Sequence, residues 1–132
     1  MEAKDLMIGD WVQICYRDRK VKVTAIYDEL IDTSSVSPLM KDEYEPIPLT
    51  DEILKKNGFE KEIGAKEVVF TCDDDDKNYR LVIHPKETNY CGIYTYIHID
   101  AGCISIEELP LEYVHELQHA LRLCGIEKEI VL

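Results

Sequence analysis

A strict alternation of side chains between residues 93 and 100 constrains the fold more than any other feature of this sequence. Apolar or β-branched residues hold one set of alternate positions: Ile93, Thr95, Ile97 and Ile99. Aromatic and polar residues hold the other: Tyr94, Tyr96, His98 and Asp100. Because successive side chains of a strand point to opposite faces, this spacing predicts an antiparallel strand with one face in the core. The other face is either a second packed layer or a partner-binding surface, so Tyr94, Tyr96 and His98 are candidate interaction residues.

Further strands are predicted on the N-terminal side of this run. Residues 8–16 and 21–27 are rich in apolar residues and are separated by the polar residues 17–20, which indicates a β-hairpin. The hairpin opens with Gly9-Asp10-Trp11-Val12, a pattern that looks like the start of a small SH3-like barrel. Two more strand-like runs flank the acidic segment Asp73-Asp74-Asp75-Asp76, whose adjacent carboxylates repel one another and indicate a solvated loop.

Two helices are predicted from their end signals. Thr50 is a good N-cap for a short helix over residues 50–57, acidic residues follow it, and Gly58 suits the stop. Pro110 suits the first turn of a C-terminal amphipathic helix over residues 109–124, and Gly125 is its C-terminal cap. Prolines at positions 46 and 48 forbid a continuous helix between residues 32 and 49, which we expect to be an irregular loop.

Together these elements predict a single α+β domain over residues 1–132, the usual size of one domain. Its segments are strand-rich residues 6–31, the loop 32–49, the helix 50–57, strands within 66–106 and the helix 109–124. We expect a small N-terminal antiparallel barrel of SH3-like type, or a sheet. The C-terminal helix should pack on the sheet through its apolar stripe.

Composition limits the classes of partner and compartment. Five scattered cysteines without a C-x-x-C pair indicate reduced thiols rather than a disulfide framework. No apolar run approaches the roughly 20 residues that span a bilayer, and no signal peptide is apparent, so we expect a cytoplasmic protein without membrane association. A net charge of −12 argues against direct nucleic-acid binding and leaves room for a protein partner. Alternatively, an acidic surface including Asp73 to Asp76 could imitate a nucleic-acid backbone.

The segment His115-Glu116-Leu117-Gln118-His119 fits H-E-x-x-H, the zinc-metallopeptidase motif. Two imidazoles four residues apart on a helix can bind one zinc ion, and the glutamate can act as a general base on zinc-bound water. A compact zinc hydrolase is therefore one hypothesis, with His115 and His119 as metal ligands and Glu116 as the catalytic base.

Three observations favour a plain helix without a cofactor. A catalytic zinc needs a third protein ligand, and Arg122 and Gly125 stand where the longer metzincin motif has glycine and histidine. Only 13 residues follow His119, too few for another packed helix that could supply a glutamate ligand. A helical wheel places His115 and His119 opposite the apolar stripe centred on Leu117, where histidines need no explanation beyond solvation.

Three segments of the chain resemble a family of uncharacterised small proteins of Bacteroidetes phages, prophages and mobile elements. The segments are LMIGDWV, EPIPLTDEILKKNGFEK and YVHELQHALRLCGIEKEI. The family patterns are L-x-I-G-N-W-V, P-I-P-L-T-E-E-x-L-x-x-x-G-F and Y-V-H-x-L-Q-N-L-Y-F-A-L-T-G, and the likeness covers about a third of the chain. In that family the position of Glu116 is often glutamine and that of His119 is commonly asparagine, so the resemblance implies a shared helix rather than a metal site. We therefore expect a non-enzymatic protein-interaction module of a phage or mobile element, with the zinc hydrolase and the nucleic-acid mimic as alternatives.

Overall fold

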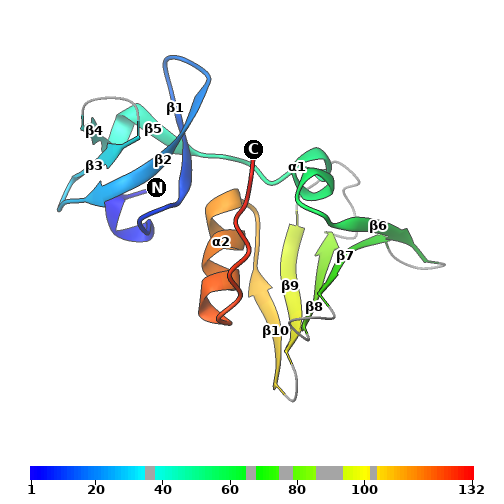
Figure 1. Ribbon diagram of the computed structural model, residues 1–132. Helices are drawn as coiled ribbons and strands as arrows, with labels where there is room; N and C mark the ends of the chain where they lie inside the picture. The colour runs from blue at the N-terminus through cyan, green and yellow to red at the C-terminus, as the bar shows by residue number, and fades with distance from the viewer. Residues whose placement is uncertain (35–37, 65–67, 75–78, 86–93, 102–103) are drawn as a thin grey trace. The chain divides into compact units, whose positions relative to one another are not determined.

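The computed structural model describes residues 1–34, 38–64, 68–74, 79–85, 94–101 and 104–132, and β9 and β10 through their backbone alone. These residues form two compact units, each built from two stretches of chain (Figure 1). Unit 1 contains Met1–Ile47 and Tyr113–His119, and unit 2 contains Pro48–Glu112 and Ala120–Leu132. Each unit has one antiparallel sheet of five strands, so the predicted α+β class is confirmed.

Unit 1 is built around a sheet with the strand order β4-β3-β2-β1-β5. Its elements are η1 (Ala3–Asp5), β1 (Trp11–Ile14), β2 (Arg19–Ile26), β3 (Leu30–Thr33), β4 (Leu39–Met40), η2 (Lys41–Glu43) and β5 (Tyr44–Pro46). Among the described residues β4 and β5 pair only with β3 and β1, so both remain edge strands. The N-terminal sheet is therefore open, and the barrel version of the prediction is wrong.

The β1–β2 hairpin confirms the first predicted pair of strands. Val12 pairs with Val21, and these two side chains are buried in a core that also receives Ile14 and Val23 from the same two strands. Asp18 closes the turn with φ of 45°, a left-handed conformation that aspartate tolerates better than most residues. The alternation of buried and outward residues thus fixes which face of the hairpin meets the core.

The expectation of an irregular loop over residues 32–49 is wrong, because β4, η2 and β5 lie inside it. Tyr44 is buried in the core of unit 1 and pairs with Ile14 of β1. Pro46 ends β5 opposite Val12, and a sheet edge tolerates proline because one side of the strand needs no N–H donor. These strands have two and three residues, too few to give a hydrophobic period in the sequence.

Unit 2 has a sheet with the order β10-β9-β8-β7-β6, in which each strand pairs with the next along the chain (Figure 1). Its strands are β6 (Glu60–Ile63), β7 (Val68–Asp74), β8 (Tyr79–Pro85), β9 (Tyr94–Ala101) and β10 (Ile104–Pro110). β9 confirms the strand predicted from the alternating run. β6 was not predicted, and all four of its residues are exposed, so it has no buried face to leave a pattern.

The short helix α1 (Asp51–Lys56) confirms its predicted caps. The Thr50 hydroxyl accepts a hydrogen bond from the Ile53 N–H at 3.3 Å. At the other end Gly58 has φ of +86°, and the Phe59 N–H donates to the Leu54 carbonyl at 3.0 Å. This is a Schellman motif, completed by the burial of Leu54 and Phe59.

Helix α2 (Val114–Leu123) is shorter than the predicted helix 109–124. Residues 109 and 110 belong instead to β10, where Pro110 pairs with Tyr96 at the edge of the sheet. The C-terminal end is as predicted: Gly125 has φ of +69°, and the Ile126 N–H donates to the Leu121 carbonyl at 2.9 Å. In the described residues, no helix is long and apolar enough to cross a membrane.

Candidate functional site

The residues before β1 form a tight turn that we call the N-terminal turn: Met7, Ile8, Gly9 and Asp10. The Asp10 N–H donates to the Met7 carbonyl at 3.1 Å, and Gly9 has φ of 93° while Ile8 keeps a negative φ. This combination defines a type II turn, whose third position requires glycine. The Asp10 carboxylate also accepts a hydrogen bond from the Met7 N–H at 2.7 Å, which closes the turn a second time.

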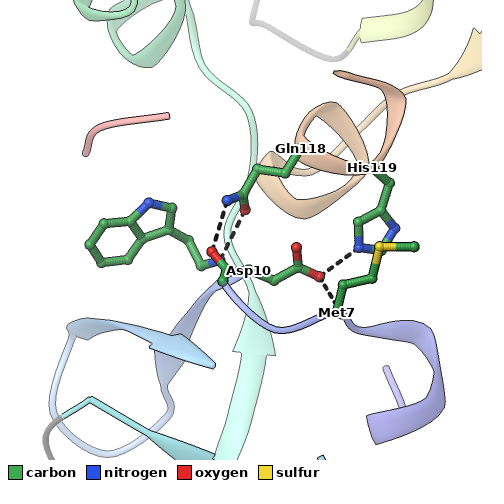
Figure 2. Close-up of polar contacts among 6 residues, drawn as sticks. Met7, Asp10, Gln118 and His119 are labelled. Carbon is green, nitrogen blue, oxygen red and sulfur yellow. Dashed lines mark hydrogen bonds and ion pairs between the residues drawn. The ribbon is translucent and has the colours of Figure 1, made fainter. Parts of the chain in front are cut away.

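Gln118 of α2 binds the backbone on both sides of Asp10 (Figure 2). Its Nε2 donates to the Gly9 carbonyl and its Oε1 accepts from the Trp11 N–H, both at 3.0 Å. The amide therefore acts as one residue of a neighbouring strand would, by offering a donor and an acceptor side by side. Gln118 is only 8% exposed, so these bonds lie largely out of water.

His119 binds the side chain of the same turn. Its Nε2 lies 2.5 Å from the Asp10 Oδ2, and Figure 2 shows this oxygen between the imidazole and the Met7 backbone. Asp10 is 0% exposed, and a carboxylate so deeply buried is stable only when hydrogen bonds or a charge compensate it. An ionised carboxylate can only accept hydrogen bonds, so Nε2 is the donor of this pair whenever Asp10 is ionised.

His115 occupies a different environment from the one predicted. It is 7% exposed, and its Nδ1 is buried without a hydrogen-bond partner among the described residues. Its ring stacks on Tyr113 at 5.8 Å between centroids and meets His119 edge-on at 5.5 Å. Burial lowers the pKa of His115 from its ordinary value. The prediction that both histidines lie on a solvated polar face is therefore wrong, because a helical wheel does not show that unit 1 covers this face.

Glu116 has a structural contact at the start of α2. Its carboxylate accepts a hydrogen bond from the Tyr113 N–H at 3.1 Å, which is the glutamate half of a capping box. Within the H-E-x-x-H segment, Glu116 thus caps its own helix, and Gln118 and His119 bind the N-terminal turn and its flank. Within the described ranges, no three His, Cys, Asp or Glu side chains are placed to hold a metal ion.

The predicted interaction residues are only partly visible. Tyr94, Tyr96 and His98 lie in β9, where the backbone of each pairs with β8, and their side chains fall outside the described part. Asp73 is exposed and forms an ion pair with Arg80 Nε at 3.4 Å. Asp74 ends β7, its side chain also undescribed, while Asp75 and Asp76 fall outside the described residues.

Sequence reasoning missed the N-terminal turn as a site. Its side chains Met7 and Ile8 are 46% and 65% exposed, although a turn so fully bonded could have carried polar residues. The Ile-Gly-Asp tripeptide was a signal for the turn itself, because a glycine before aspartate suits a positive φ. The link to Gln118 had no sequence signal, since 109 positions separate it from Gly9.

Comparisons of this chain with protein-family models, with curated proteins and with solved structures find no match. The phage and mobile-element resemblance therefore stays a prediction. Any functional conclusion depends on the bonds, burial and charges of the described residues.

Proposed function

We propose that this chain is a non-enzymatic protein-interaction module, encoded by a phage or mobile element as the sequence resemblance implies. In this proposal unit 1 presents the N-terminal turn to a protein partner. The proposal depends on one observation: several intramolecular hydrogen bonds hold a turn that exposes an isoleucine, Ile8, to solvent.

The backbone groups of Met7, Gly9 and Asp10 are hydrogen-bonded from within the protein. Besides the bonds from Gln118, the Gly9 N–H donates to the Val23 carbonyl at 2.7 Å and the Asp10 carbonyl accepts from the Val23 N–H at 2.9 Å. A turn fixed in this way loses little conformational freedom when a partner binds it, and preorganisation of this kind strengthens association. Single exposed apolar residues are common on protein surfaces, but two neighbours on a rigid turn provide a compact anchor for an apolar pocket.

The same bonds weigh against the zinc hydrolase. A zinc ion at His119 would have to compete with Asp10 for Nε2, and a base at Glu116 would have to release the Tyr113 N–H. Native mass spectrometry of tag-free protein titrated with zinc tests this point, with His119→Asn as the comparison variant because asparagine can still donate to Asp10. We expect no stoichiometric zinc. One tightly held zinc ion that His119→Asn loses would overturn the non-enzymatic assignment.

The interaction itself is tested by quantitative affinity purification from a Bacteroidetes host, the group to which the resemblance points. The variant is Ile8→Ser, and the matched control is Ile63→Ser, which removes an equally large apolar side chain, 78% exposed, from β6. We expect a partner that wild type and the control recover and that Ile8→Ser loses, while thermal unfolding stays unchanged. A partner retained equally by all three proteins would contradict the role of the turn.

A further inference from the structure

The outer face of the β1–β2 hairpin differs in chemistry from the rest of this acidic chain. Its inner face consists of the buried valines and isoleucine of the unit 1 core. On the outer face Trp11 pairs across the strands with Lys22, and Gln13 pairs with Lys20. Directly opposite residues of an antiparallel pair point to the same side, so both lysines and the indole share this face.

Three cations of this hairpin have no carboxylate partner in the part of the chain that the structure describes. Arg17, Arg19 and Lys20 are exposed, and none of them forms an ion pair with any residue that the structure describes. Elsewhere lysines do find carboxylates, as Lys61 does with Asp51 at 3.2 Å. In a chain with 27 acidic and 15 basic residues, three cations within four positions that pair with no described carboxylate are a local exception.

Lys22 and Trp11 define the centre of this cluster. The Lys22 Nζ lies 5.1 Å from the centroid of the Trp11 ring, a cation–π contact that fixes the ammonium over the indole. A partner that relied on stacking a base against this face of the ring would have to displace the lysine. The net charge of −12 would also repel a long polyphosphate chain more strongly than a short acidic peptide, because a long polyanion comes within the screening distance of about 10 Å of more carboxylates.

We infer that this basic hairpin surface, formed by Trp11, Arg17, Lys20 and Lys22, binds an extended acidic segment of a protein partner. Lys20 and Lys22 are two residues apart in β2, so their positions repeat at about 6.6–6.8 Å along the strand. An extended peptide with carboxylates at alternate positions has the same spacing. Arg17 in the turn adds charge at one end of the row, whereas Arg19 pairs with the buried Ile14 and lies on the other face of β2.

This surface goes beyond the N-terminal turn and is independent of it. The turn precedes β1 and the arginines follow β1, so the two sites share no side chain that the proposed experiments change. Loss of either interaction leaves the other testable, since Ile8→Ser does not alter the charge of the hairpin.

The chain contains a single tryptophan, Trp11, so its intrinsic fluorescence reports on this surface alone. The probe is a synthetic octapeptide of alternating glutamate and serine, titrated at low salt into the full chain. The test variant is Arg17→Ser/Lys20→Ser, and the matched control is Lys55→Ser/Lys56→Ser, which removes two exposed neighbouring cations from α1. Circular dichroism verifies that each protein is folded.

We expect a saturable fluorescence change that sodium chloride weakens, with the dissociation constant raised about tenfold in the hairpin variant and less than twofold in the control. Equal weakening by both variants would show diffuse charge attraction and overturn the inference. The absence of a fluorescence change at millimolar peptide would also overturn the inference. Tighter binding of an octathymidylate probe than of the acidic peptide would assign the surface to nucleic acid instead.

Discussion

Replacement of Gln118 by methionine tests whether the helix holds the N-terminal turn in place. Methionine has nearly the same length, volume and helix propensity as glutamine, so Gln118→Met removes the two hydrogen bonds with little change in packing. The Gly9 carbonyl and the Trp11 N–H each lose a partner at 3.0 Å. The matched control is Gln13→Met, which removes one exposed side-chain hydrogen bond to Glu45.

The expected magnitude follows from burial. A backbone group that stays largely buried without a hydrogen-bond partner lowers the free energy of unfolding by about 1–3 kcal/mol. Gln118→Met leaves two such groups, the Gly9 carbonyl and the Trp11 N–H. Burial of the methionine side chain returns roughly 1–2 kcal/mol, because Gln118 lies mostly out of solvent. The free energy of unfolding should therefore fall by about 2 kcal/mol in Gln118→Met. An exposed substitution such as Gln13→Met should change it by less than about 0.5 kcal/mol.

Urea unfolding followed by Trp11 fluorescence measures the free energy of unfolding of both variants. The indole is a suitable probe because it belongs to the residue whose N–H binds Gln118. With an unfolding slope of about 2 kcal/mol per molar urea, the midpoint of Gln118→Met should fall by about 1 M. A shift no larger than that of Gln13→Met would refute the reasoning, since it would mean that water replaces both bonds without loss.

Three further predictions concern the remaining groups of α2. Burial lowers the pKa of His115, so below about pH 7 the unfolded chain binds more protons at this residue than the folded chain does. The free energy of unfolding should therefore fall as the pH drops through about 6.5. His115→Phe should flatten this pH dependence in urea titrations between pH 7.5 and 5, and parallel slopes for wild type and variant would contradict the prediction. Glu116→Gln keeps an acceptor for the Tyr113 N–H and should lower stability by less than 0.5 kcal/mol, whereas Glu116→Ala should cost about 0.5–1 kcal/mol in the same measurement, and equal effects would exclude the capping role. Gly125→Ala meets no atom within 4 Å of the new Cβ, so its cost of about 1 kcal/mol should come from the positive φ alone and should be smaller in Gly125→Asn.

Local signals in the sequence predicted the parts of the fold that depend on neighbours in the chain. Thr50, Gly58 and Gly125 marked helix ends because capping is chemistry between residues a few positions apart. The alternation in β9 and the β1–β2 hairpin were predicted for the same reason. The short strands β4 and β5 were missed, because pairing with β3 and β1 holds them in place and leaves no periodic pattern.

The candidate site shows the same limit. H-E-x-x-H drew attention to His115, Glu116 and His119 as a group, and the structure places all three on α2. Their roles come from residues that no local pattern links to them. Asp10 fixes His119, while Gln118, which the motif leaves as an arbitrary residue, binds the backbone of Gly9 and Trp11 on both sides of Asp10.

The 109 positions between Asp10 and His119 also bear on how unit 1 is made. On the ribosome the N-terminal strands emerge long before the helix that neutralises their buried carboxylate, so this sheet cannot reach its final state until α2 has been synthesised. Closing so long a loop carries an entropic cost that rises with the logarithm of its length, and such distant contacts slow folding. A fragment ending at residue 47 should therefore lack a stable sheet. A separate peptide containing residues 113–123 could restore it, which would make this chain a natural starting point for a two-part complementation reporter.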